Sequence, residues 1–169
     1  MANHLMVFMH LVWATDGRRP LLHPTLEASP SARRPLPFLP SGGAGPTSLR
    51  EDGGVHDHIR TKCRHLRCTV LAVGGMPDHV HLLVELHPTV SVSALAKEVK
   101  GASSHAAAHL LRAGPSFRWQ TGYGAFSVSH GDVRRATAYV LRQKEHHASG
   151  TLSSALEALP TPSISAPPR

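Results

Sequence analysis

Apolar positions along the chain fall into short runs separated by turn residues, and four of these runs have the composition of β-strands. Strands are short, rich in β-branched and aromatic residues, and bounded by glycine, proline or other turn residues. The four segments are 4–14 (HLMVFMHLVWA), 68–75 (CTVLAVGG), 79–86 (HVHLLVEL) and part of 117–129 (FRWQTGYGAFSVS). Only a short turn separates the second from the third, so we expect these two to form a hairpin.

Three other segments have a sequence compatible with helices. Residues 55–67 form the first, and Ser91 is a suitable N-cap for a second that runs to about Leu111 with apolar residues at three- and four-residue spacing. A third helix is expected from about Asp132 to His147. Its predicted core face is Val133, Ala136, Thr137, Val140 and Leu141.

Proline and glycine interrupt the pattern between the first strand and the first helix. Residues 28–54 include PSARRPLPFLPSGGAGP, through which no continuous helix or strand can run, so we expect a long loop or a disordered segment. The last residues, 150–169, are dominated by Ser, Ala and Pro and are expected to be a disordered tail. The chain is therefore predicted to be one domain, 1–149, followed by this tail.

This order of strands and helices predicts an α+β fold, an antiparallel sheet with helices packed on one face. The composition fits such a domain, since 41% of the residues are hydrophobic. Cys63 and Cys68 match neither a metal-binding motif nor a disulfide framework, so we expect buried free thiols. The N-terminal apolar run is too short to cross a bilayer and has no basic leader, which favours a cytoplasmic protein without a membrane partner.

The charge balance favours a polyanionic partner. Eighteen Lys and Arg against eleven Asp and Glu give a formal net charge of +7. Such a surplus attracts nucleic acid, but many small basic proteins bind none, so the net charge alone is weak evidence for a nucleic-acid partner.

Two histidines in the third predicted strand are candidate metal ligands. Because side chains alternate along a strand, His79 and His81 project from one face while Val80 and Leu82 point to the other. Two imidazoles with one further donor can hold a divalent cation and leave positions open for a phosphate oxygen. In a chain with 14 histidines, ordinary surface or core histidines are the competing interpretation.

The surrounding sequence decides between these interpretations. MPDHVHLLVEL resembles the histidine–hydrophobic–histidine (HUH) signature of single-tyrosine transposases, including those associated with repetitive extragenic palindromes. HLVWAT, VSALAKEVKGASS, FRWQTGYGAFSVS and AYVLRQKEHH also resemble blocks of that family, in the family's order, so that the resemblance covers most of the chain. It implies a ferredoxin- or RRM-like HUH domain in which the Pro/Gly-rich segment 28–54 replaces part of the first helix.

The resemblance also implies the catalytic residues and their reaction. AYVLRQ matches the family's tyrosine nucleophile and the polar metal ligand four residues later, which gives Tyr139 and Gln143 these roles beside His79 and His81. Mg²⁺ or Mn²⁺ is the implied cation. The implied reaction is cleavage and strand transfer of single-stranded or hairpin DNA through a 5′-phosphotyrosine intermediate. Tyr123 is the competing nucleophile, and it lies in a segment that does not have a helical pattern.

Several residues are candidates for contacts with the DNA backbone or bases. They are Lys97, Lys100, Ser103 and Ser104 on the second predicted helix, and Arg118 beside Trp119. A solvated helix face is the competing interpretation for the first four, and a core anchor for Trp119. His146 lies near the tyrosine and could assist it.

Three functions remain open at this point. The first is the transposase; the second is a degenerate or domesticated DNA-binding or nicking protein that acts on chromosomal hairpins, which the irregular segment 28–54 favours. The third is an unrelated metal hydrolase that uses His79 and His81 to activate water and does not need Tyr139. Relatives include monomers and dimers that exchange the tyrosine helix, so a homodimer and a nucleoid location are expectations of the resemblance only.

Overall fold

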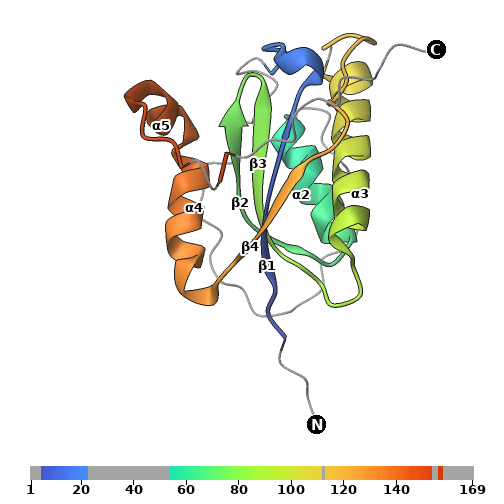
Figure 1. Ribbon diagram of the computed structural model, residues 1–169. Helices are drawn as coiled ribbons and strands as arrows, with labels where there is room; N and C mark the ends of the chain where they lie inside the picture. The colour runs from blue at the N-terminus through green and yellow to red at the C-terminus, as the bar shows by residue number, and fades with distance from the viewer. Residues whose placement is uncertain (1–4, 23–53, 112, 154–155, 158–169) are drawn as a thin grey trace, which may run out of the picture.

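Four antiparallel strands form the centre of the protein in the order β2-β3-β1-β4, as the computed structural model shows for residues 5–22, 54–111, 113–153 and 156–157 (Figure 1). The strands are β1 (Phe8–Ala14), β2 (Thr69–Met76), β3 (His79–Glu85) and β4 (Gly124–Val128). All three strand pairs are antiparallel. The predicted α+β class and the four predicted strands are confirmed.

The two central strands, β1 and β3, are buried along almost their whole length. A strand with neighbours on both sides and helices on its faces excludes water, which is why their sequences are nearly continuous apolar runs. The predicted hairpin is also present, since a two-residue turn at Pro77 and Asp78 joins β2 to β3. This turn places Asp78 directly before the first of the two histidines.

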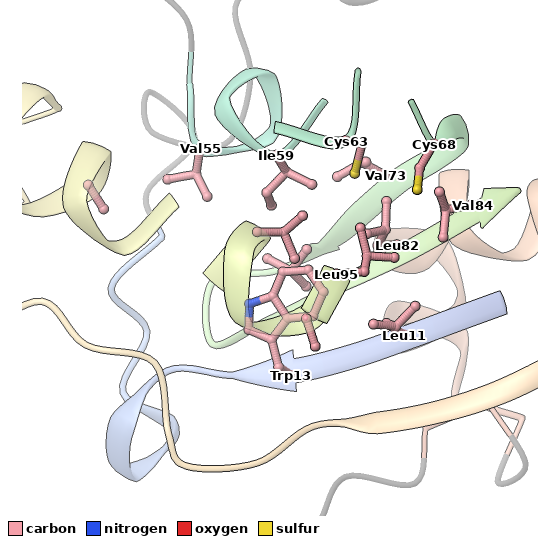
Figure 2. Packing of buried hydrophobic residues seen from close by; sticks show 14 of the residues in the cluster. Leu11, Trp13, Val55, Ile59, Cys63, Cys68, Val73, Leu82, Val84 and Leu95 are labelled. Atoms are coloured by element: carbon pink, nitrogen blue, oxygen red, sulfur yellow. The ribbon is translucent and has the colours of Figure 1, made fainter. Parts of the chain in front are cut away.

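One face of the sheet packs against α2 (Val55–His65) and α3 (Val92–His105). Figure 2 shows this core, in which Leu11, Trp13 and Leu82 of the sheet meet Ile59 and Leu95 of the helices. The alternation of side chains along the strands sends these sheet residues to one side. Cys63 and Cys68 are free, buried thiols, as predicted.

The second predicted helix starts where its sequence predicts. The hydroxyl of Ser91 accepts a hydrogen bond from the backbone N–H of Ala94 at 3.1 Å, which is the expected N-cap contact. After His105 the chain continues as a π-helical turn, Ala106–Leu110. Together the helix and this turn span the range predicted for one helix, from Ser91 to about Leu111.

The opposite face of the sheet is covered by α4 (Val133–Leu141), with α5 (Gln143–Ser149) following it. A smaller cluster joins Ala72 and Leu83 of the sheet to Ala136 and Val140 of α4. Helices therefore lie on both faces, whereas the sequence predicted them on one. The additional layer is the one that carries the predicted tyrosine.

Gly74 of β2 permits the close approach of α4 to the sheet. A Cβ at this position would lie 2.1 Å from the backbone oxygen of Val140, which no side chain can tolerate. The glycine was predicted only as the end of a strand. Its position under α4 explains how the helix backbone comes next to the sheet.

The predicted continuous helix over 132–147 was wrong in one respect. Arg142, with φ −105° and ψ 23°, breaks it into α4 and α5. Leu141 precedes this break and is 62% exposed, so its assignment to the core was also wrong. Ala136 and Val140 are buried as predicted.

Two predictions fall mostly outside the described residues. Of the segment 28–54 only Gly54 is described, and it is the residue that precedes α2. Of the predicted tail, residues 150–153 and 156–157 are described. Among the helices of the described ranges, none has the length and apolar character needed to cross a bilayer.

Candidate active site

His79 and His81 of β3 lie on the face that α4 covers, and both side chains are fully buried. Their rings are 5.1 Å apart between centroids and inclined at 73°. Both side chains therefore project from one face of the strand, as predicted. A charged or polar ring at zero exposure requires partners, and each histidine obtains one at its Nδ1 atom.

His79 is oriented by the turn residue that precedes it. Its Nδ1 lies 2.7 Å from Oδ1 of Asp78, whose other oxygen accepts a hydrogen bond from Nε of Arg18 at 3.0 Å. Burial alone would raise the pKa of Asp78, but the contacts with His79 and Arg18 lower it to about 2. In the neutral tautomer that donates from Nδ1 to this carboxylate, Nε2 of His79 is a lone pair, the arrangement common in metal-binding histidines.

His81 is oriented by a histidine of the neighbouring strand. Nε2 of His10 lies 2.9 Å from Nδ1 of His81, and the two rings are stacked at 12° with centroids 5.1 Å apart. Burial, with a smaller effect of His81, lowers the pKa of His10 to about 3, so its ring is neutral. In the tautomer that leaves Nε2 of His81 free for a ligand, His81 donates from Nδ1 and His10 accepts.

Polar atoms around these rings are buried without a hydrogen-bond partner. They are Nε2 of His79, of His81 and of His147, and both amide atoms of Gln143, whose residue is only 1% exposed. Leaving such atoms unpaired is costly, so a group of them marks a place for a ligand. Imidazole nitrogens and an amide oxygen are donors that a divalent transition cation accepts, and the residues thus fit a metal.

Tyr139 of α4 reaches the same place. Its ring meets that of His81 edge to face at 6.4 Å and stacks on His146 at 4.7 Å. Its hydroxyl donates to Oε1 of Glu157 at 2.6 Å and accepts from the backbone N–H of Ser153 at 3.1 Å. Burial and the hydrogen bond to Glu157 raise the pKa of Tyr139.

The predicted set of His79, His81, Tyr139 and Gln143 is thus brought together from β3, α4 and α5. Tyr139 and Gln143 were expected to share one face of a continuous helix. The break at Arg142 separates them into two helices, yet both are buried, and a contact with Gln143 acts against the rise in the pKa of Tyr139. His146, which was named as an assistant, stacks on the tyrosine ring.

Glu157 is the site residue that sequence reasoning missed. Its Oε1 lies 3.4 Å from Nε2 of His81, and its Oε2 lies 3.8 Å from Nε2 of His79. Although burial acts in the other direction, the contacts with His81 and Tyr139 lower the pKa of Glu157 to about 2. It belongs to a segment rich in Ser, Ala and Pro, and nothing in that composition indicates a buried carboxylate.

The predicted DNA contacts on α3 do not join this site, because α3 covers the opposite face of the sheet. Lys97 is exposed there, while Ser104 is half-buried. Nζ of Lys100 donates to the backbone oxygens of Gln120 and Gly122, which fixes the chain before β4. Lys100 thus has a structural role.

Ser103 and Trp119 are structural as well. Ser103 is fully buried, donates to the oxygen of Val99 at 2.6 Å and accepts from Nε1 of Trp119 at 3.0 Å. Trp119 packs edge to face on Trp13, with centroids 5.9 Å apart, which agrees with the core-anchor interpretation. Arg118 is exposed, and its backbone oxygen accepts from Asp16.

An open hollow of about 420 Å³ adjoins the tyrosine. It lies between the end of β4 and α4, and it is lined by Ser127, Val128, Ser129, Asp132, Arg135, Ala136, Tyr139, Ser153 and Leu156. Tyr139 is thus on the wall of this hollow, although the residue is only 8% exposed.

A four-stranded antiparallel sheet with two histidines on alternate positions of a central strand, faced by a tyrosine helix, defines the class of single-tyrosine HUH transposase domains. The chain belongs to the IS200-like transposase family, whose model matches residues 4–143.

Two solved structures share this fold. A protein of Deinococcus radiodurans described as a candidate transposase is 19% identical, with a TM-score of 0.53 over 91% of this chain and 97% of its own. A REP-associated tyrosine transposase bound to a REP hairpin is 15% identical, with a TM-score of 0.51 over 87% of this chain and 74% of its own. No curated protein matches the sequence.

Proposed function

We propose that this protein cleaves and rejoins single-stranded DNA, with Tyr139 as the nucleophile and His79, His81 and Gln143 as ligands of a divalent cation. The observation that carries the proposal is the meeting of the tyrosine with the two histidines, whose Nε2 atoms are buried and unpaired. These residues come from positions sixty apart in sequence. A packing role alone does not account for unpaired polar atoms beside a tyrosine hydroxyl.

The arrangement of the two histidines and of Gln143 supports the binding of a cation. Asp78 and His10 hold the Nδ1 atoms, so that both Nε2 atoms are available. Gln143 supplies an amide oxygen that has no other partner. When bound, Mg²⁺ or Mn²⁺ provides positive charge that stabilises the extra negative charge developing on a phosphate.

Tyr139 carries out the covalent step. Its Oη attacks the phosphorus of a DNA phosphodiester, a bond forms between Oη and phosphorus, and the bond from phosphorus to the 3′ oxygen breaks. The phenol proton is released, and the leaving 3′ oxygen takes up a proton to become a hydroxyl. The 5′-phosphotyrosine that remains is attacked by the 3′ hydroxyl of another strand in the reverse reaction, which transfers the strand and restores Tyr139.

Hairpin or single-stranded DNA is the proposed partner. The net charge of +7 favours a polyanion, and a structural neighbour was solved with a REP hairpin. The hollow beside Tyr139 is an entry for one strand, and Arg135 on its wall can contact a phosphate. The tyrosine of each chain is proposed to act at the histidines of the same chain, because Tyr139 meets His81 within one chain.

A labelled single-stranded hairpin oligonucleotide incubated with the protein and Mn²⁺, then separated by denaturing electrophoresis, tests the proposal. We expect a slow covalent adduct for the wild type and none for Tyr139→Phe. Tyr123→Phe is the matched control, since it removes the other tyrosine hydroxyl and should retain the adduct. An adduct that persists in Tyr139→Phe would exclude this nucleophile.

The same assay separates the alternative functions. Hairpin binding by the wild type without any adduct, on DNA that a related transposase cleaves, selects a degenerate or domesticated DNA-binding protein. Metal-dependent cleavage that survives Tyr139→Phe and leaves no covalent species selects a hydrolase that activates water. His81→Ala should abolish cleavage under either enzymatic function, and this variant confirms that the activity belongs to the protein.

A further inference from the structure

The carboxylate of Glu157 lies between the three groups that define the site. Its Oε1 accepts the hydroxyl hydrogen of Tyr139 at 2.6 Å and lies 3.4 Å from Nε2 of His81. Its Oε2 lies 3.8 Å from Nε2 of His79. The Glu157 side chain is 16% exposed, so its contacts are made in a largely water-excluded place.

We propose that Glu157 is a ligand of the cation held by His79 and His81, so that this residue beyond α5 forms part of the metal centre. The inference rests on the metal centre of the proposed function and extends its ligand set. None of the family-derived ligands lies in this segment, and Glu157 follows the end of the family match at residue 143.

Hydrogen-bond chemistry around the histidines carries the argument. Asp78 and His10 hold the Nδ1 atoms, so the Nε2 atoms present lone pairs to the site. Neither Nε2 atom makes a hydrogen bond, although the carboxylate of Glu157 is next to both. In the tautomers that donate from Nδ1, both Nε2 lone pairs face the carboxylate of Glu157, and a cation between the three atoms would be coordinated by all of them.

The distances agree with this interpretation. Donor atoms that share one cation at roughly 2.1 Å lie about 3 to 4 Å apart. The 3.4 Å and 3.8 Å separations of Glu157 from the two Nε2 atoms fall in this range. A nitrogen of His79, one of His147 and a carboxylate oxygen of Glu157 also lie within 4.8 Å of one another. His147 therefore places a further donor, with an unpaired buried Nε2, beside the same carboxylate.

A carboxylate ligand at this position connects the cation to the nucleophile. The oxygen nearest His81 is the one that accepts from Tyr139. The carboxylate therefore holds Oη beside the cation before DNA arrives. A carboxylate also adds negative charge to a set that otherwise contains only neutral imidazoles and an amide, which strengthens binding of Mg²⁺ or Mn²⁺.

Manganese binding by the full-length protein without DNA tests the inference, measured by titration calorimetry and by the electron paramagnetic resonance signal of free Mn²⁺. Glu157→Gln keeps the size of the side chain and an oxygen that accepts from Tyr139, and removes the charge. We expect its affinity for Mn²⁺ to fall at least about tenfold. Glu145→Gln is the matched control, because it removes an exposed carboxylate of α5 and should bind as the wild type does.

His81→Ala distinguishes this inference from the metal centre itself. Loss of Mn²⁺ binding in His81→Ala together with unchanged affinity in Glu157→Gln keeps the metal centre and overturns the role of Glu157. A wild type that binds no Mn²⁺ overturns both. A Glu157→Gln variant that binds Mn²⁺ normally but forms more DNA adduct also overturns it, since the carboxylate would then occupy the position of a DNA phosphate. Glu157→Asp, which retains the charge, should recover part of the lost affinity.

Discussion

His10 of β1 is stacked on His81 of β3, with Nε2 of the first ring 2.9 Å from Nδ1 of the second. The side chain of the proposed metal ligand His81 is therefore positioned by a residue of the neighbouring strand. An acceptor at Nδ1 fixes the tautomer and the plane of an imidazole, and such outer partners strongly affect metal affinity. His10 was predicted to lie in the first strand, but no role was predicted for its side chain.

Replacing His10 should weaken metal binding without dismantling the fold. His10→Leu fills the buried position but removes the acceptor, and we expect affinity for Mn²⁺ to fall by about 10- to 100-fold in calorimetry. Met9→Leu is the control, because Met9 is the adjacent residue of β1 and packs against the core of the other face. Unchanged affinity in His10→Leu would mean that backbone geometry alone orients His81.

Gly74 should not tolerate a side chain. Its added Cβ would collide with the backbone oxygen of Val140, so Gly74→Ala must displace α4 and with it Tyr139. We expect a loss of roughly 1–3 kcal/mol in the free energy of unfolding, measured by denaturant titration. The rate of adduct formation should fall with it.

Gly101→Ala is the control for Gly74→Ala. Gly101 lies within α3, and nothing comes within 4 Å of a Cβ built there. Gly101→Ala should stabilise the protein by roughly 0.5–1 kcal/mol, because alanine is the better helix former. Equal effects of the two alanine substitutions would show that α4 does not need its close approach to β2.

The sheet was predictable because its residues obey a simple alternation. Leu11 and Trp13 point to one face and His10 and Val12 to the other, and the apolar run of β3 has the same form. The positions of His79 and His81 on one face followed from that period alone. Tyr139 and Gln143 could be assigned only through the resemblance to a family, since an aromatic on an amphipathic helix is usually a packing residue.

Other features could not be predicted because they depend on tertiary contacts. The break at Arg142 lies in a sequence of good helix formers, and local propensity gives no reason for it. Glu157 reaches the site from a segment whose composition is typical of a tail. Lys100 and Ser103 have the residue types of phosphate ligands, yet contacts with Gln120 and Trp119 occupy them.

Lys97 and Lys100 should therefore respond differently to substitution. Lys100→Met removes the hydrogen bonds to Gln120 and Gly122, and we expect a loss of about 1–2 kcal/mol in unfolding free energy. Lys97 is exposed, so Lys97→Met should leave stability unchanged. If Lys97 contacts a phosphate, the plot of the logarithm of the hairpin binding constant against the logarithm of the salt concentration should be less steep for Lys97→Met than for the wild type, by about one unit. An unchanged slope would remove Lys97 from the DNA interface.

His56 should make the stability of the fold depend on pH. It is 7% exposed near the start of α2, and burial, with smaller effects of Arg60 and Lys144, lowers its pKa from 6.5 to about 3. Between these two values the unfolded chain binds a proton that the folded chain excludes. The contribution of His56 is therefore favourable above pH 6.5 and is lost progressively as the pH falls towards 3, by up to about 1.4 kcal/mol per pH unit.

Urea unfolding from pH 7 to pH 4, with chelator present so that metal release does not contribute, measures this dependence. His56→Gln carries no titrating group, and its stability should fall less steeply with decreasing pH than that of the wild type. His65→Gln, at the exposed end of the same helix, should follow the wild-type slope. Because the shift in His56 comes mainly from burial, a His56→Gln slope as steep as the wild type's would mean that α2 opens in acid before the sheet unfolds.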